Sequence, residues 1–222
     1  MMKPAPKRAS IQAPRLPKRL DAAAIARLED HAEYAALELN GCDFSGQAAQ
    51  DVLFEQVRLR RAILTGSRLS RVRLGDVRLE GSDLSAANWE KARFQRAEFN
   101  GCRFLGAQLL DAQFEDALFK DCNLEGSILF SAALKAARFE NCNLRGVSFA
   151  QADLRGAVFL HSDLTEADLQ GAKLDGADLR GSILNGMRAG AKDLQGVVID
   201  STQAVQVVAL LGVVVDDDPP EV

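Results

Sequence analysis

Large apolar residues recur at every fifth position along most of this chain. From Leu39 to Leu184 each fifth residue is Leu, Phe or Trp, and Ala49 is the exception. A small or compact residue, such as Ala92 or Cys102, usually stands two positions before the large one. Most of the 17 glycines stand two positions after a large residue. A repeat this regular outweighs any local preference for helix or strand.

A period of five residues fits neither regular element. On an α-helix five residues turn through about 500°, so successive large side chains would not share a face. On a flat strand an odd period sends alternate large side chains to opposite faces. Both conflicts disappear if the chain turns a corner once per repeat, with glycine supplying backbone freedom there. The pattern therefore predicts an all-β solenoid whose coils pair as parallel strands and wind in a right-handed sense.

Four repeats, or twenty residues, are predicted to make one four-sided coil, because two sets of core residues recur at multiples of that interval. The phenylalanines that we expect to stack are Phe99, Phe119, Phe139 and Phe159. The cysteines that share one column are Cys42, Cys102, Cys122 and Cys142. Without CxxC spacing, and with side chains projecting in parallel, they do not favour a metal site or a disulfide. We expect a structural ladder of small residues, with no metal and no cofactor.

The repeats resemble the A-(D/N)-L-x-x motif of pentapeptide repeat proteins, as in Ala152-Asp153-Leu154-Arg155-Gly156 and Ala177-Asp178-Leu179-Arg180-Gly181. The resemblance covers residues 37–199 and implies a right-handed quadrilateral parallel β-helix. Short N-terminal and C-terminal capping helices are expected, since a solenoid leaves open edges and an exposed core at each end.

Five segments are expected along the chain. They are a disordered basic tail over 1–20, an N-terminal cap over 21–36, the β-helix over 37–199, a C-terminal cap over 200–215 and a loose acidic tail over 216–222. Within the caps, the pattern predicts a helix over Asp21–Glu33 and another over Ser201–Leu211, followed by a strand over Val213–Val215. Asp200 or Ser201 would cap the second helix, and Gly212 would end it.

The predicted C-terminal helix is apolar nearly all round, so one face would close the rod and the other would remain uncovered. A second copy of the chain is one candidate cover, with Val205, Val208 and Leu211 at the interface. Pentapeptide repeat proteins that this chain resembles dimerise through their C-terminal ends. The alternative is that Val213–Val215 folds over the same face within a monomer.

Composition narrows the functional classes. The net charge is -4, which does not favour a generic polyanion binder. Neither histidine, His31 or His161, belongs to a catalytic or metal-binding motif, so we expect a non-enzymatic protein with no catalytic residues. No apolar run is long enough to span a membrane, and the N-terminus lacks the apolar centre of a secretory signal. A cytoplasmic protein with reduced thiols is expected.

Three surface features are candidates for binding a protein partner. Leu110, Ile128 and Phe130 are apolar residues at neighbouring outward positions, which either mark a partner site or are isolated exposed residues. A set of carboxylates gathers toward the C-terminal half: Asp153, Asp163, Glu166, Asp168, Asp175 and Asp178. Seven arginines stand against Asp76 alone between Gln56 and Leu79, without the interleaved aromatic residues that single-stranded nucleic acids stack on.

The resemblance includes fluoroquinolone-resistance proteins and self-resistance proteins for topoisomerase poisons, which bind DNA gyrase and are thought to imitate DNA. It implies a gyrase-binding DNA mimic, and the alternative is an interaction scaffold for another protein. Direct nucleic-acid binding through the arginines is a distant third. The chain departs from the plasmid-borne members because no loop interrupts its repeats and because its arginines interrupt any continuous acidic face.

Overall fold

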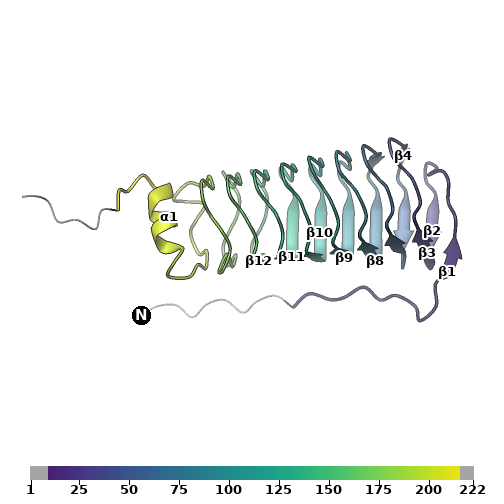
Figure 1. Cartoon of the computed structure of the whole chain (residues 1–222), viewed down its shortest axis with the longest axis horizontal. Helices are drawn as coiled ribbons and strands as arrows, with labels where there is room; N and C mark the ends of the chain where they lie inside the picture. Colours follow the sequence, from purple (N-terminus) through teal and green to yellow (C-terminus); the bar gives the residue numbers. More distant parts are fainter. Residues whose placement is uncertain (1–9, 216–222) are drawn as a thin grey trace, which may run out of the picture.

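The computed structural model describes residues 10–215. They form a rod of stacked coils with a helix at one end, as Figure 1 shows. The strands of the first half are β1 (Asp21–Ala23), β2 (Glu33–Ala35), β3 (Leu37–Asn40), β4 (Ala48–Gln50), β5 (Leu53–Glu55), β6 (Arg58–Arg60) and β7 (Arg68–Ser70). Then follow β8 (Arg73–Glu80), β9 (Arg93–Asn100), β10 (Gln113–Lys120), β11 (Ala133–Glu140), β12 (Val158–Leu160) and the helix α1 (Ala204–Leu210). The predicted solenoid is confirmed.

The strands pair in parallel with a register of twenty residues. In β9, β10 and β11, Phe94 lies opposite Phe114 and Phe114 opposite Leu134. β8 to β11 are the longest strands and form the middle of a ten-stranded sheet. The twenty-residue coil deduced from the cysteines and phenylalanines is therefore the repeat of the hydrogen-bonded ladder itself.

Left-handed backbone conformation marks the corners of the coils. The residue two positions after each large core residue has a positive φ through most of the rod, for example +65° at Gly126 and 54° at Ala136. Glycine adopts this conformation without a Cβ penalty, whereas other residues incur a cost of roughly 1–2 kcal/mol. The corner geometry explains why glycines gather at this position, and the ladder holds residues such as Arg61 there as well.

The aspartate or asparagine of the motif has a structural role in many turns. Its side-chain oxygen, one position before the large residue, accepts a hydrogen bond from the backbone N–H two residues further on. At Asp43 and Asp163 this distance is 2.9 Å, and at Asn123 it is 3.0 Å. These bonds close Asx turns, which favour Asp and Asn over longer side chains.

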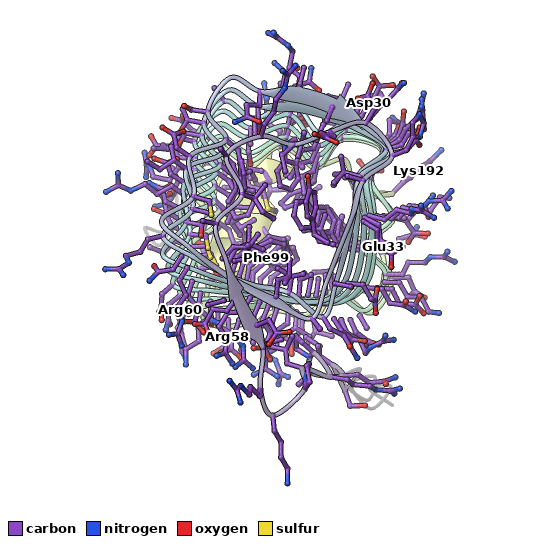
Figure 2. The ribbon with its side chains drawn as sticks, turned by 90° about the vertical axis from the view of Figure 1, so that its right-hand side faces the viewer. Asp30, Glu33, Arg58, Arg60, Phe99 and Lys192 are labelled. Atoms are coloured by element: carbon purple, nitrogen blue, oxygen red, sulfur yellow. The ribbon has the colours of Figure 1, made fainter. Side chains whose placement is uncertain are left out.

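Phenylalanines stack along one column of the core. Ring centroids lie 4.7 Å apart for Phe99 and Phe119, 4.8 Å for Phe119 and Phe139, and 4.9 Å for Phe139 and Phe159. The rings of each pair are nearly parallel, and the four side chains are fully buried. In the end-on view of Figure 2, Phe99 lies inside the coil while Arg58 and Arg60 project outward.

Cys102, Cys122 and Cys142 form a buried ladder of free thiols in the core. Each thiol donates to backbone carbonyl groups; Cys122 Sγ lies 3.3 Å from the carbonyl oxygen of Phe99. Hydrogen bonds shared with Cys102 and Cys142, together with burial, raise the pKa of the Cys122 thiol. In residues 10–215, no three His, Cys, Asp or Glu side chains are arranged to hold a metal ion.

The predicted helix over Asp21–Glu33 is wrong. Its first residues form β1, which pairs in parallel with β3, and Leu28 further along is buried in the core. The strand satisfies backbone groups at the open edge of the first coil, which a helix would leave unpaired. Parallel pairing with the neighbouring coil therefore overrides the local helical pattern.

Residues 10–20, expected to be part of a disordered tail, instead run as an extended segment beside the coils (Figure 1). The backbone N–H of Arg15 donates to Asp76 Oδ1 at 2.8 Å, and the side-chain amide of Gln56 donates to the Arg15 carbonyl at 3.3 Å. These two bonds attach the segment to one corner of the rod. The remainder of the expected basic tail, residues 1–9, and the expected acidic tail, 216–222, lie outside the described residues.

The C-terminal cap contains the predicted helix in shorter form. The carboxylate of Asp200 accepts hydrogen bonds from the N–H groups of Thr202 and Gln203, each at 3.0 Å, just before α1 begins. The Gln203 amide donates to two carbonyl groups of the last coils, at 2.7 Å each, and so closes the end of the core. Gly212, with a φ of +76°, follows the helix as expected.

The strand predicted over Val213–Val215 is wrong, because these residues have no regular secondary structure. The N–H of Val213 bonds to the carbonyl of Val208 at 3.4 Å, and the three valines are exposed rather than folded over α1.

In residues 10–215, no helix has both the length and the apolar character needed to cross a bilayer.

Candidate protein-binding surface

One side of the rod carries an uncharged surface over three successive coils. Its outward positions, here called the Phe130 side, are Gln108, Leu110, Ile128, Phe130, Ser148 and Ala150. Gln108, Ile128 and Ser148 are register partners, which places these residues on adjacent coils. Phe130 is 43% exposed and Ile128 is 37% exposed, whereas Leu110 is half-buried. The structure thus brings together the three apolar residues singled out from the sequence.

Leu105 is a further exposed apolar residue that the sequence reasoning missed. It lies in the same coil as Leu110, on the other side of the corner at Gly106. The signal was present in the sequence, because Leu105 directly follows the core residue Phe104 and so occupies an outward position.

The six candidate carboxylates do not form one surface. By register, Asp153 and Asp175 share one side of the rod, and each of the other three sides carries one of Asp163, Asp168 and Asp178. Glu166 lies at a corner, with a φ of 60°. The structure therefore distributes the negative charge around the rod.

Arginines neutralise four of these six carboxylates. The shortest distances between charged atoms are 2.6 Å for Asp153 and Arg155, and 2.8 Å for Asp178 and Arg180. For the other two pairs they are 3.3 Å for Asp163 and Arg145, and 3.2 Å for Asp168 and Arg188.

Each of these four carboxylates also accepts a backbone N–H in its own turn. The hydrogen bond from Arg155 lowers the pKa of Asp153. The side chains that looked like a binding surface therefore serve local turns and ion pairs.

Among residues 10–215, carboxylates on adjacent coils pair with four of the seven arginines in the arginine-rich stretch: Arg58, Arg60, Arg71 and Arg78. Arg60 lies 2.9 Å from Glu80 and 3.1 Å from Glu38, and Arg78 lies 2.7 Å from Glu98. Arg71 binds Asp51 at 2.7 Å. The count of seven arginines against one aspartate between Gln56 and Leu79 therefore overstates the positive charge on this surface, because it leaves out the carboxylates on neighbouring coils.

The end of the rod exposes a second apolar surface. Val205 and Leu211 are exposed and Val208 is half-buried, while Val207 and Leu210 pack against the core. Val213–Val215 adds further exposed apolar area next to the helix. The candidate interface residues therefore lie at this end of the rod.

Comparison with known proteins places the chain in a family. Residues 92–179 match the description "Pentapeptide repeat region", and residues 38–76 match "Pentapeptide repeats (8 copies)". None of the curated proteins compared with the chain is significantly similar to it.

Several solved structures resemble the rod. A trypsin-treated form of QnrB1, a plasmid-mediated fluoroquinolone resistance protein, is 25% identical with a TM-score of 0.50, covering 83% of this chain and 100% of that chain. A second such form is 24% identical with a TM-score of 0.51, covering 88% and 99%. HetL from the cyanobacterium Nostoc sp., involved in heterocyst differentiation regulation, is 22% identical with a TM-score of 0.30, covering 78% and 89%. The repeat, the parallel coils and the two matches to pentapeptide repeat descriptions show that the chain belongs to the pentapeptide repeat family.

Proposed function

We propose that this chain is a non-enzymatic protein-binding rod whose partner is DNA gyrase. The observation that carries protein binding is the Phe130 side, an uncharged and partly apolar surface on a rigid scaffold of hydrogen-bonded coils. Surfaces of this kind mark interaction sites when apolar residues are contiguous. The choice of gyrase rests on the likeness to a fluoroquinolone resistance protein and on the family resemblance.

We propose that the rod binds gyrase by a means other than reproducing the negative charge of a DNA duplex. A duplex carries about one negative charge per 1.7 Å of its axis. Here the candidate carboxylates are spread over the four sides of the rod, and four are paired with arginines. We therefore assign the central contact to Ile128 and Phe130, with the carboxylates contributing a weaker attraction that salt screens.

The main test uses supercoiling by the gyrase of the source organism, with and without a gyrase poison. The full chain is expected to inhibit supercoiling or to protect it from the poison. Ile128→Ser with Phe130→Ser should raise the concentration required at least tenfold. Ile63→Ser is the matched control, because Ile63 is equally exposed but lies on another side of the rod. Absence of both inhibition and protection at low salt would contradict the gyrase assignment.

A second test separates charge from fold. Asp163→Asn with Asp168→Asn removes two charges while keeping the side-chain oxygen that closes each turn. A modest loss of gyrase effect in this variant, smaller than that of the Phe130-side variant, supports the assignment. A larger loss would make charge the principal recognition element.

The alternative function is an interaction scaffold for another protein, and the apolar character of the Phe130 side favours it over a purely acidic mimic. Affinity capture from the native lysate, with the full chain and the Ile128→Ser, Phe130→Ser variant, distinguishes the two. Gyrase subunits lost from the variant support the first function. A different protein lost from the variant supports the scaffold.

A further inference from the structure

Arg73 and Arg93 are stacked directly on one another in the solenoid. They are register partners at the starts of β8 and β9, so their backbones lie about 4.8 Å apart. Both side chains are exposed, and neither makes an ion pair or hydrogen bond with any other residue between 10 and 215. Like charges directly opposite one another in a ladder are destabilising. Among residues 10–215, the two guanidinium groups therefore have no direct ion-pair partner, and Asp51 acts on Arg73 only from a longer distance.

Elsewhere the chain supplies that counter-charge. Arg58 and Arg78 are also register partners, but Arg78 lies 2.7 Å from Glu98 and Arg58 lies 3.9 Å from Glu80. Each of these two arginines thus has a carboxylate one coil away. Arg73 and Arg93 differ from this pair because neither makes an ion pair with any residue between 10 and 215.

A groove of about 620 Å³ lies along the corner next to these two arginines. Arg71 and Lys91 line it together with Arg73 and Arg93, against the carboxylates of Asp51 and Asp111. Arg71 holds Asp51 at 2.7 Å, so one of the two acids is already neutralised. A volume of this size suits a small ligand. The groove walls include no Phe, Tyr or Trp, and so offer no platform for stacking a nucleobase.

We propose that this groove binds a small polyphosphate anion, a diphosphate or triphosphate group, between the guanidinium groups of Arg73 and Arg93. Planar guanidinium groups bind phosphate oxygens through paired hydrogen bonds. An anion with several charges matches two arginines on adjacent coils better than a single carboxylate does, and it relieves their mutual repulsion. The site is independent of the Phe130 side and extends beyond the proposed function.

The test is isothermal titration of the full chain with inorganic tripolyphosphate at constant ionic strength, together with its melting temperature. We expect binding and a rise in melting temperature for the unaltered chain. Arg73→Gln with Arg93→Gln should weaken binding at least tenfold and abolish the rise. Without the anion this variant should melt no lower than the unaltered chain, because it removes the repulsion between the arginines.

Arg103→Gln is the control. Arg103 is an exposed arginine whose register partners are Asp83 and Asn123 rather than another cation, so tripolyphosphate binding should not change. Equal binding by the double variant would overturn the proposal, as would an equal response to sulfate at the same ionic strength. Tighter binding of a short DNA duplex than of tripolyphosphate, lost in the same variant, would reassign the groove to nucleic acid.

Discussion

Arg96 lies one coil beyond Asp76 and donates to both of its carboxylate oxygens, at 2.6 and 2.7 Å. The Asp76 side chain is only 5% exposed, and it also accepts the backbone N–H of Arg15 at 2.8 Å. One carboxylate therefore joins two successive coils and the extended segment beside them. The hydrogen bond from Arg96 lowers the pKa of Asp76.

Asp76→Ala is expected to lower the free energy of unfolding by about 3–5 kcal/mol, because it leaves the guanidinium of Arg96 partly buried without its partner. Urea denaturation at pH 7 measures the change. Glu115→Ala is the control, since Glu115 pairs with Lys135 at an exposed position and should contribute less than about 1 kcal/mol. An equal loss of unfolding free energy in the two variants would show that the buried Asp76–Arg96 pair stabilises the protein no more than an exposed pair does.

Acid should weaken the rod through the same residue. The folded-state pKa of Asp76 lies below its unfolded value, which is about 3.9. Its contribution is therefore fully present above about pH 4 and is lost as the pH falls through the folded-state pKa. Urea denaturation at pH 7 and pH 3 should show a smaller loss of stability on acidification for Asp76→Asn than for the unaltered chain. An equal loss in both proteins would assign the acid sensitivity to other carboxylates.

Phe119→Ala should destabilise the protein by about 3–5 kcal/mol, because it removes one of the two inner rings from the phenylalanine stack and leaves a cavity. Denaturant titration measures the effect. Lys120→Ala, at the neighbouring outward position, should change the unfolding free energy by no more than about 0.5 kcal/mol. A cost near 0.5 kcal/mol for Phe119→Ala would mean that the column repacks without loss.

The corners predict opposite effects for two small substitutions. Gly126→Ala should cost about 1–2 kcal/mol from backbone conformation alone, because nothing lies within 4 Å of the added Cβ. Ala136→Gly relieves the same kind of strain, offset by about 0.5–1 kcal/mol of added chain entropy in the unfolded state, so its net effect should be near zero or stabilising. Melting temperatures distinguish the two. Destabilisation by both would contradict the role of the corner φ.

The end of the rod is predicted to form a homodimer through Val205, Val208 and Leu211. Light scattering of the full chain at micromolar concentration should give twice the mass of 24.0 kDa. Val205→Asp with Leu211→Asp should yield folded monomers, since charges in an apolar interface disfavour association. Deleting residues 201–222 should yield monomers or insoluble protein, because it also removes Gln203. A monomeric full chain, or a soluble truncation that remains dimeric, would rule out this interface.

The interior of the rod was predictable because its register repeats. Any residue such as Phe99 has its neighbour at Phe119, and the sequence alone provides the interval. The ends lie outside the repeat, so only local preference was available there. That preference favoured a helix at Asp21–Glu33, where pairing with the next coil produces β1.

The candidate surfaces were predictable in part. The outward placement of Ile128 and Phe130 follows from the five-residue period. The charge distribution did not follow from linear counts, because successive five-residue repeats lie on different sides of the coil. Pairs such as Arg60 with Glu80 appear only when residues one coil apart are compared.

The twenty-residue register also constrains how such a gene can change length. Loss of one whole coil would leave every remaining side chain in its column, so Phe99 would stack on Phe139 in place of Phe119. Loss of a single five-residue repeat between Phe99 and Phe119 would turn everything downstream by one side and set Leu124 above Phe99 instead. We therefore expect tolerated insertions and deletions in descendants of this gene to come in steps of sixty base pairs, with rod length inherited coil by coil.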